Sequence, residues 1–299
     1  MLAVVIGLEK YNMIIIKLIG GLGNQMFQYS LGRCLSEKLN CDLKLDINSY
    51  SNQCGLTPRN YELGVFKIKE CFADVEEINH LKNKKRSFFQ KLFGIKKIYY
   101  CSENSFSFDN EVLNLTENAY LEGYWQSEKY FKRIEKILKT EFVLKNEMPK
   151  SNKEFLEQIK CTNSVSLHVR RGDYISDPII NEVHGVCGLG YYRKAVNYIA
   201  EKVDNPHFFV FSDDKEWVKN NLLTKFPTIF VNCNHNDSGH LDMMLISNCK
   251  HHICANSSFS WWGAWLGKND NKIVIAPQKW FNNCNRETKD LIPNSWIKL

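Results

Sequence analysis

Residues 13–47, MIIIKLIGGLGNQMFQYSLGRCLSEKLNCDLKLDI, decide the fold class of this 299-residue chain. The apolar run 13–19 predicts a buried strand, and 41–47 predicts a second one. Between them, 25–39 predicts a helix, because its large apolar side chains recur every fourth residue (Phe27, Leu31, Leu35, Leu39). The order strand, helix, strand favours an α/β protein with a parallel sheet.

The glycine cluster between the first strand and the helix raises the possibility of a bound dinucleotide. The usual pattern is G-x-G-x-x-G, but Met26 stands where the third glycine belongs. An acidic ribose partner is expected about 20 residues further on, where this chain has aspartates (Asp42, Asp46). The dinucleotide interpretation is therefore incomplete but open, and the polar pair Asn24-Gln25 occupies the start of the helix.

Composition describes a folded protein without the charge of a nucleic-acid binder. Hydrophobic residues make up 44% of the chain and charged residues 24%, so the chain can bury a large core in one or, as we expect, two domains. The net charge of +6 is modest; it suits a phosphorylated metabolite or an anionic membrane surface and argues against nucleic acid. The basic and aromatic stretch 83–97 is either an amphipathic helix at a membrane or partner, or an ordinary solvated helix face.

Cysteine usage and the N-terminal residues predict a cytoplasmic protein. The eleven cysteines are an odd number without a C-x-x-C pair, which argues against a disulfide framework and a zinc site. Polar residues interrupt the first apolar run well below the roughly 20 residues of a membrane span (Glu9, Lys10, Asn12, Lys17). Met13 directly precedes the first strand, so we expect residues 1–12 to be dispensable, with translation beginning at Met1 or Met13.

The second half of the chain repeats the α/β alternation. Residues 145–163 are polar and lysine-rich, which predicts a connection between the halves. Five predicted strands then alternate with helical stretches (164–169, 207–212, 228–232, 251–255, 272–277). We therefore expect two domains, 13–150 and 151–299, the second one doubly wound.

Three polar motifs follow strands of this second half and should meet at one edge of its sheet. They are HVRRGDY (168–174), SDD (212–214) and ANSSFSWWGAW (255–265). Ligands of doubly wound sheets bind beyond the carboxyl ends of the strands. The two arginines of the first motif are permanently charged donors suited to phosphate, and the N-S-S run can cap a helix whose N-terminus holds an anion. A salt-bridged loop, a plain helix cap and core tryptophans are the alternatives.

These motifs carry a resemblance to a known family. GGLGNQMFQY (20–29), HVRRGDY and ANSSFSWWGAW, in that order, resemble the bacterial alpha-1,2-fucosyltransferases, and EGYWQSEKYF (122–131) is similar to another stretch of that family. The resemblance implies a GT-B-like fold of two facing Rossmann-type domains, with the acceptor on the N-terminal side and GDP-fucose held by the C-terminal domain. It also implies fucose transfer to the 2-hydroxyl of a terminal galactose, with inversion. A fucosyltransferase of another linkage and an NAD(P)-dependent oxidoreductase are the alternatives.

The donor residues follow from charge and from the resemblance. Negative charge builds on the departing pyrophosphate, and we expect Arg170 to bind it, with Arg171 beside it or paired with an aspartate. By resemblance, Asn24 contacts the leaving oxygen or the fucose. Carboxylates are expected on the guanine and ribose, Asp173 among them. The full set of donor-binding candidates is His168, Arg170, Arg171, Asp173, Asp213, Asp214, Asp242, Asn256, Ser257 and Ser258.

The acceptor needs a group that removes its hydroxyl proton and a surface that binds the sugar. Glu122, Asp173 and His184 are of the right type for the base. Tyr124 and Trp125 can stack on galactose, or they are buried core.

Sequence also bounds the cofactors and partners. No two aspartates stand two positions apart, so the chain lacks the Asp-x-Asp motif that binds a divalent metal in many nucleotide-sugar enzymes. We expect no metal and no other cofactor, with arginines and a helix N-terminus in the metal's place. The expected partners are GDP-fucose and a galactose-terminated acceptor of a surface glycan. The chain sequence does not specify an oligomeric state.

Overall fold

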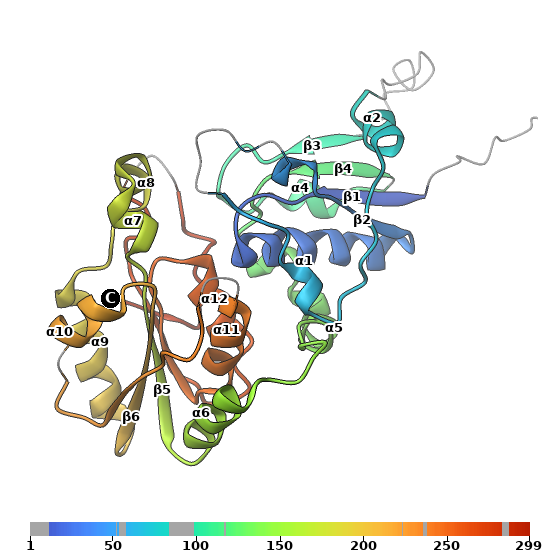
Figure 1. The fold of residues 1–299 in the computed structure, drawn as a ribbon. Helices are drawn as coiled ribbons and strands as arrows, with labels where there is room; N and C mark the ends of the chain where they lie inside the picture. The colour runs from blue at the N-terminus through green and yellow to red at the C-terminus, as the bar shows by residue number, and fades with distance from the viewer. Residues whose placement is uncertain are drawn as a thin grey trace, which may run out of the picture.

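Two parallel β-sheets, each flanked by helices, form the two halves of the molecule (Figure 1). The computed structural model describes residues 12–51, 53, 58–83, 99–116, 118–222, 224–235, 238–282 and 287–299. The first eleven residues, and nearly all of the basic and aromatic stretch 83–97, lie outside this part of the chain. The expected α/β, GT-B-like architecture is the observed one.

The N-terminal sheet has the strand order β2-β1-β4-β3. All its pairings are parallel. The predicted β-α-β unit forms its centre, since helix α1 connects β1 to β2. The later strand β4 pairs with the other side of β1, so the order of strands reverses between β1 and β4. The bounds are β1 Met13–Lys17, α1 Leu22–Leu39, β2 Asp42–Asp46, β3 Tyr100–Ser102 and β4 Ala119–Glu122.

The C-terminal sheet has the order β10-β9-β8-β5-β6-β7, again parallel throughout. Its five predicted strands are confirmed, and the short β10 is an addition that apolar periodicity did not mark. The strand order reverses between β5 and β8: β6 and β7 extend the sheet on one side of β5, and β8, β9 and β10 extend it on the other. The bounds are β5 Asn163–Val169, β6 Pro206–Ser212, β7 Thr228–Phe230, β8 His251–Ile253, β9 Val274–Ala276 and β10 Ile297–Lys298.

Helices connect and cover the strands of both halves. In the N-terminal half they are α2 Val75–Asn83, α4 Asn110–Leu113 and α5 Glu135–Glu141, with short 3-10 turns η1 Asn48–Tyr50, η2 Leu63–Val65, η3 Glu128–Tyr130 and η4 Lys132–Ile134. In the C-terminal half they are α6 Lys150–Lys160, α7 Gly172–Ser176, α8 Pro178–His184, α9 Leu189–Lys202, α10 Lys215–Asn221, α11 Gly239–Asn248 and α12 Ser258–Trp265.

The stretch 145–163, expected as a connection, contains helix α6. Its polar residues outnumber its apolar ones, but Phe155, Leu156 and Ile159 lie on one helical face. They pack into a cluster with residues of β6 and α11. The connection between the halves is therefore shorter than expected, because a narrow apolar face is enough to dock a helix.

A shared core joins the two halves where α1 packs against α12. The side chain of Phe27 on α1 lies 4.5 Å from the ring of Trp261 and 5.0 Å from that of Trp262, centroid to centroid. Both tryptophans are fully buried. For them the core interpretation of the SWWGAW run is confirmed. Because α1 has the sheet on one side and α12 on the other, it is buried around most of its circumference.

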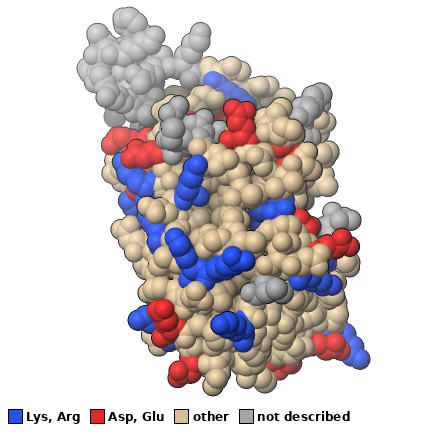
Figure 2. All heavy atoms as spheres, turned by 90° about the vertical axis from the view of Figure 1, so that its left-hand side faces the viewer, with Lys and Arg blue, Asp and Glu red and all other residues tan. Residues whose placement is uncertain are grey.

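Three further observations concern membrane-spanning helices, cysteines and surface charge. Within the described residues, no helix is both long enough and apolar enough to cross a bilayer, and the nine cysteines in this part of the chain are unpaired. Figure 2 shows basic and acidic side chains interspersed on a mostly neutral face of the C-terminal half. This distribution is that of an ordinary solvated surface and agrees with the modest net charge.

Candidate active site

The three motifs of the C-terminal half meet at one edge of its sheet, as predicted. HVRRGDY begins with the last two residues of β5, SDD begins with the last residue of β6, and ANSS follows β8; these strands run parallel. The edge includes the switch point between β5 and β8, where doubly wound sheets bind their ligands.

The N-terminal sheet presents an equivalent switch point between β1 and β4. Asn24 lies in the first turn of α1, which follows β1, and Gln126 lies in the turn that follows β4. The Nε2 group of Gln126 donates a hydrogen bond of 2.8 Å to Oδ1 of Asn24 and so ties the two turns together. A cleft of about 1200 Å³ is lined by this pair and by the three loops of the C-terminal half. Its volume is sufficient for a nucleotide sugar.

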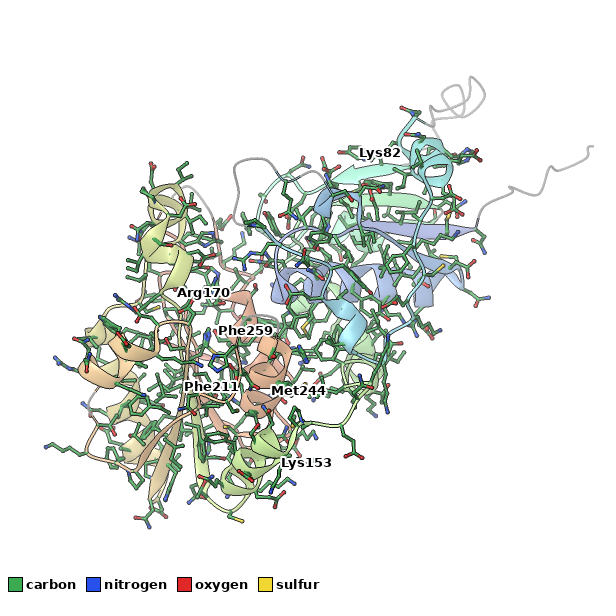
Figure 3. All side chains as sticks on the ribbon, viewed as in Figure 1. Lys82, Lys153, Arg170, Phe211, Met244 and Phe259 are labelled. Atoms are coloured by element: carbon green, nitrogen blue, oxygen red, sulfur yellow. The ribbon has the colours of Figure 1, made fainter. Side chains whose placement is uncertain are left out.

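Arg170 is held in this cleft by two carboxylates. Its Nη2 donates to Oδ1 of Asp173 at 2.6 Å, and its Nη1 lies 2.9 Å from Oδ2 of Asp213. Burial acts to lower the pKa of Arg170, but the attraction of Asp213 and Asp173 outweighs it and raises that pKa. Figure 3 shows Arg170 at the end of β5, on the side that faces the N-terminal half. The result is a fixed, planar cation of the kind that binds a pyrophosphate.

Arg59, from the N-terminal half, also contacts Asp173. Its Nη2 donates to Oδ2 of Asp173 at 2.6 Å. Both oxygens of Asp173 therefore accept hydrogen bonds from guanidinium groups, one from each half of the molecule. In this arrangement Asp173 positions Arg170, and its role as a base stays a prediction.

Arg171 is paired with an aspartate, which was one of its two expected arrangements. Its Nε donates to Oδ2 of Asp214 at 3.0 Å, and its guanidinium carbon lies 3.9 Å from the ring centroid of Trp217. Asp214 also caps α10 by accepting a hydrogen bond from the backbone N–H of Trp217. Both residues line the cleft, but their side chains are already engaged with α10.

His168, near the end of β5, is buried in the cleft wall. Its Nδ1 has no hydrogen-bond partner among the described residues. Burial is the main cause that lowers the pKa of His168 to about 4; Asp213 partly offsets it and Arg170 adds to it. The imidazole is therefore neutral near pH 7 and has an unused polar atom for a ligand.

We expect the melting temperature to fall as the pH is lowered from 7 to 5, in part because His168 stays neutral in the folded protein. The unfolded chain binds a proton near pH 6.5 and the folded chain only near pH 4. Unfolding therefore takes up a proton in this window, so stability rises with pH. Between pH 6.5 and pH 4 the free energy of unfolding changes by roughly 3 kcal/mol.

Thermal melts of wild type and of a His168→Asn variant across this pH range test the expectation. Burial also lowers the pKa of His252, which is present in both proteins and therefore cancels in the comparison. The variant should show the shallower dependence, and equal slopes would contradict the assignment.

Asp242 offers a second unused acceptor. It lies in the first turn of α11 and lines the cleft. Its Oδ1 accepts a hydrogen bond of 2.6 Å from Nδ2 of Asn234, whose carbonyl is held in turn by Lys215. Burial raises the pKa of Asp242, and the Asn234 bond opposes this. Its Oδ2 has no partner within the described chain, so the carboxylate can accept N–H donors of a base.

Asn256, expected to bind the donor directly, is instead used within the protein. It is buried, and its Nδ2 lies 2.9, 3.3 and 3.2 Å from the carbonyl oxygens of His184, Gly185 and Trp280. These bonds tie the β8 loop to the segment that follows α8. Its side-chain amide therefore shapes the cleft, which Asn256 also lines, and direct contact with the donor stays a prediction.

The N-terminus of α12 lies where the two halves meet. Ser257 caps it by accepting a hydrogen bond of 3.3 Å from the backbone N–H of Phe259, as expected of an N-cap. A Cβ on Gly23 of α1 would lie only 2.6 Å from the carbonyl carbon of Ser258, so this contact requires glycine. Ser257 and Ser258 both line the cleft.

The glycine turn after β1 places Asn24 in the same cleft. Gly20 has φ +77, a left-handed conformation that favours glycine, and a Cβ there would lie 2.5 Å from Nδ2 of Asn24. With Oδ1 of Asn24 held by Gln126, its Nδ2 donors have no partner in the described part of the chain. The turn thus presents an amide donor from the half opposite Arg170.

The structure separates the four acceptor candidates. Tyr124 and His184 line the cleft, whereas Glu122 and Trp125 do not. Glu122 is paired with Lys17 at 2.6 Å. Trp125 is 1% exposed within the N-terminal core. Of the two interpretations left open for Trp125, the buried-core one is observed, because adjacent residues of the turn after β4 face opposite sides.

Tyr124 belongs to a row of aromatic rings that lines the cleft across both halves. Phe106 stacks on Tyr124 with centroids 6.1 Å apart, and Phe281 lies 5.1 Å from Phe106. The row continues through His184, 5.2 Å from Phe281, to Tyr174, 4.8 Å from His184. Its ring faces offer apolar surface for the C–H face of a sugar.

Among the cleft residues that were not singled out from the sequence are Arg59, Phe106 and Gln126. Arg59 and Phe106 lie in irregular segments that no motif marks. Gln126 lies within the quoted run EGYWQSEKYF, and predicting β4 as a strand would have placed it at a switch point.

In the ranges that the structure describes, no three His, Cys, Asp or Glu side chains form a group that could hold a metal ion.

Comparison with known proteins gives one matching family. The model described as glycosyl transferase family 11 matches residues 4–299.

Two relatives from Escherichia coli match over nearly the whole of both chains, and one relative from Aotus azarae matches over half of this chain. An alpha-1,2-colitosyltransferase of Escherichia coli is 36% identical and is matched over 96% of this chain and 99% of its own. The O-antigen biosynthesis glycosyltransferase WbnK of Escherichia coli is 34% identical over 94% and 98%. The galactoside alpha-(1,2)-fucosyltransferase 1 of Aotus azarae is 27% identical, over 50% of this chain and 43% of its own.

Proposed function

The chain belongs to glycosyl transferase family 11, and from this we propose that it transfers L-fucose from GDP-fucose to the 2-hydroxyl of a terminal galactose, with inversion. The observation that carries the proposal is Arg170, fixed between Asp173 and Asp213 at the switch point of the C-terminal sheet. It supplies a rigid positive charge where a departing pyrophosphate needs one. The relatives that act in alpha-1,2 transfer support the linkage.

On the donor side, we propose that Arg170 binds the pyrophosphate and that Asp242 and His168 bind the nucleoside. The second oxygen of Asp242 is free to accept the N–H donors of guanine. The unpartnered Nδ1 of His168 is a second polar group in the same wall. Arg59 and the N-terminus of α12 add positive charge and backbone donors on the cleft lining.

Catalysis on this proposal is mostly electrostatic. As the bond from fucose to phosphate breaks, positive charge develops on the sugar ring and negative charge on the pyrophosphate. Arg170 stabilises the latter, and Nδ2 of Asn24 donates to the leaving oxygen or the fucose from the other side of the cleft. The acceptor galactose lies against the aromatic row. The three candidate bases are Glu122, Asp173 and His184. Glu122 does not line the cleft, and Asp173 is ion-paired with two arginines. His184 lines the cleft and is not part of those ion pairs.

A second donor is favoured by the alpha-1,2-colitosyltransferase relative. Colitose is fucose without its 3-hydroxyl, so the same cleft can accept either GDP-sugar unless a residue requires that hydroxyl. The identity of 36% over nearly the whole chain makes this the alternative to test first.

The experiment is a transfer assay with both donors. Purified protein is incubated with GDP-fucose or GDP-colitose and a panel of β-galactosides, and the product linkage is determined by NMR. An alpha-1,2-fucosyl product supports the proposal. A product formed only from GDP-colitose would show that the enzyme transfers colitose and not fucose. A product of another linkage would show that the 2-hydroxyl of galactose is not the acceptor.

We also expect transfer to proceed without a divalent metal. On this proposal arginines and the start of α12 neutralise the pyrophosphate in place of a metal, and the aspartates nearest Arg170 are already ion-paired. Rates in excess EDTA should stay within about twofold of those with added Mg²⁺ or Mn²⁺. Activity that disappears with chelator and returns with a divalent ion would contradict this.

A further inference from the structure

Gln126 has one half of its amide satisfied and the other half unsatisfied. The residue is 7% exposed and lines the cleft. Its Nε2 donates to Asn24, whereas its buried Oε1 has no hydrogen-bond partner among the residues described. A buried acceptor without a partner is unfavourable, and a ligand that donates a hydrogen bond removes the penalty.

The turn that carries Gln126 is held rigidly. Trp125 has φ +56, a left-handed conformation that a tryptophan rarely adopts. The carboxylate of Glu103 accepts the backbone N–H groups of Tyr124 and Trp125 at 2.7 and 2.9 Å and stabilises this conformation. Strained backbone of this kind persists where the surrounding structure fixes it, often beside a ligand. The position of Oε1 is therefore set before any ligand binds.

Asn24 and Gln126, which both line the cleft, leave one donor and one acceptor without a partner among the described residues. The donor is Nδ2 of Asn24 and the acceptor is Oε1 of Gln126, since their other amide atoms bond to each other. A hydroxyl group both accepts and donates a hydrogen bond, so it complements the pair. A phosphate oxygen without a proton does not, because it cannot donate to Oε1.

We propose that Gln126 is a specificity-determining residue that, with Asn24, binds one hydroxyl of a substrate sugar. The proposal rests on the proposed glycosyl transfer. The hydroxyl belongs either to the donor fucose or to the acceptor galactose, which present the same chemistry.

Gln28 provides a matched control. It is fully buried, and both halves of its amide are used within the protein: Oε1 accepts from the backbone N–H of Ile19 at 3.1 Å, and Nε2 donates to the carbonyl of Gly123 at 3.0 Å. It is not part of the cleft lining. Methionine has a similar length and no polar atoms of comparable strength, so Gln126→Met and Gln28→Met remove the same group from the two environments.

The two variants should behave in opposite ways. Gln126→Met should lower kcat/KM at least about tenfold while changing the melting temperature little. Gln28→Met should lower the melting temperature, because two satisfied buried bonds are lost, and leave kcat/KM of the folded enzyme within about threefold of wild type. Equal kcat/KM for Gln126→Met and wild type would overturn the proposal.

Deoxy substrates identify the hydroxyl and distinguish this role from a merely structural one. The rates of wild type and Gln126→Met are compared on GDP-fucose analogues lacking the 2-, 3- or 4-hydroxyl, and on galactosides lacking the 3-, 4- or 6-hydroxyl. For the hydroxyl that Gln126 binds, removing both partners should lower kcat/KM hardly more than removing either one. Losses that are additive on every analogue would overturn the proposal.

An inactive wild type would count against the proposed transfer and leave Gln126 to be judged by binding. Calorimetry with GDP-fucose and with lactose then compares wild type with Gln126→Met. A weaker affinity of the variant for one of the two sugars supports the assignment, and unchanged affinities for both overturn it.

Discussion

Replacing Arg170 by alanine is expected to lower kcat/KM about a thousandfold and to abolish tight GDP binding. The guanidinium is the fixed charge that faces the pyrophosphate. Its loss also leaves Asp173 and Asp213 as uncompensated carboxylates beside an anionic ligand. Steady-state transfer from GDP-fucose gives the first quantity, and calorimetric titration with GDP gives the second.

Two variants separate the role of Arg170 from its contribution to folding. Arg170→Lys keeps the charge but loses the planar fork, so we expect an intermediate loss of roughly tenfold to a hundredfold. Arg33→Lys changes a buried arginine outside the cleft, paired with Glu141 at 2.9 Å and Glu37 at 2.6 Å, and should affect stability without affecting GDP affinity. An Arg170→Ala protein that binds GDP within about threefold of wild type would show that the pyrophosphate lies elsewhere.

Replacing Asn24 by alanine is expected to lower kcat roughly a hundredfold while GDP affinity stays within about twofold of wild type. The reason is its position: Asn24 belongs to the N-terminal half, across the cleft from the proposed nucleotide site. On the proposed function its Nδ2 donors meet the reacting groups, whereas GDP is held mainly by residues of the other wall. Single-turnover transfer and calorimetry with GDP measure the two effects separately.

The conservative variant sharpens this prediction. Asn24→Asp keeps the size of the side chain but replaces its donors by an acceptor with negative charge, so it should be at least as impaired as Asn24→Ala. If GDP affinity fell while kcat was preserved, the glycine turn after β1 would have only a structural role.

The C-terminal half was predictable from sequence because its signals are local. Each polar motif follows an apolar strand, and parallel pairing then requires that the motifs share one edge. Arg170, Asp213 and the Ser257 cap came together for this reason. The fold class followed from the same alternation, which the N-terminal β-α-β unit also shows.

The remaining features depend on tertiary contacts that no local pattern specifies. The strands β3 and β4 are only three and four residues long, too short for a clear alternation. Arg59 reaches Asp173 from a segment without regular structure, 114 residues away in sequence. Tyr124 and Trp125 are adjacent aromatic residues that the sequence does not distinguish. The backbone conformation at Trp125 decides which of the two faces the cleft.

A thermal-shift experiment with GDP tests the central claim, that the cleft is the site of a GDP-sugar transferase, most directly. A ligand that binds only the folded protein raises its melting temperature by mass action. We predict a rise of about 5 °C at a GDP concentration a hundred times the Kd, and no comparable rise with NAD(P) or with galactose alone. No shift with GDP, or a shift with NAD(P) instead, would contradict the account.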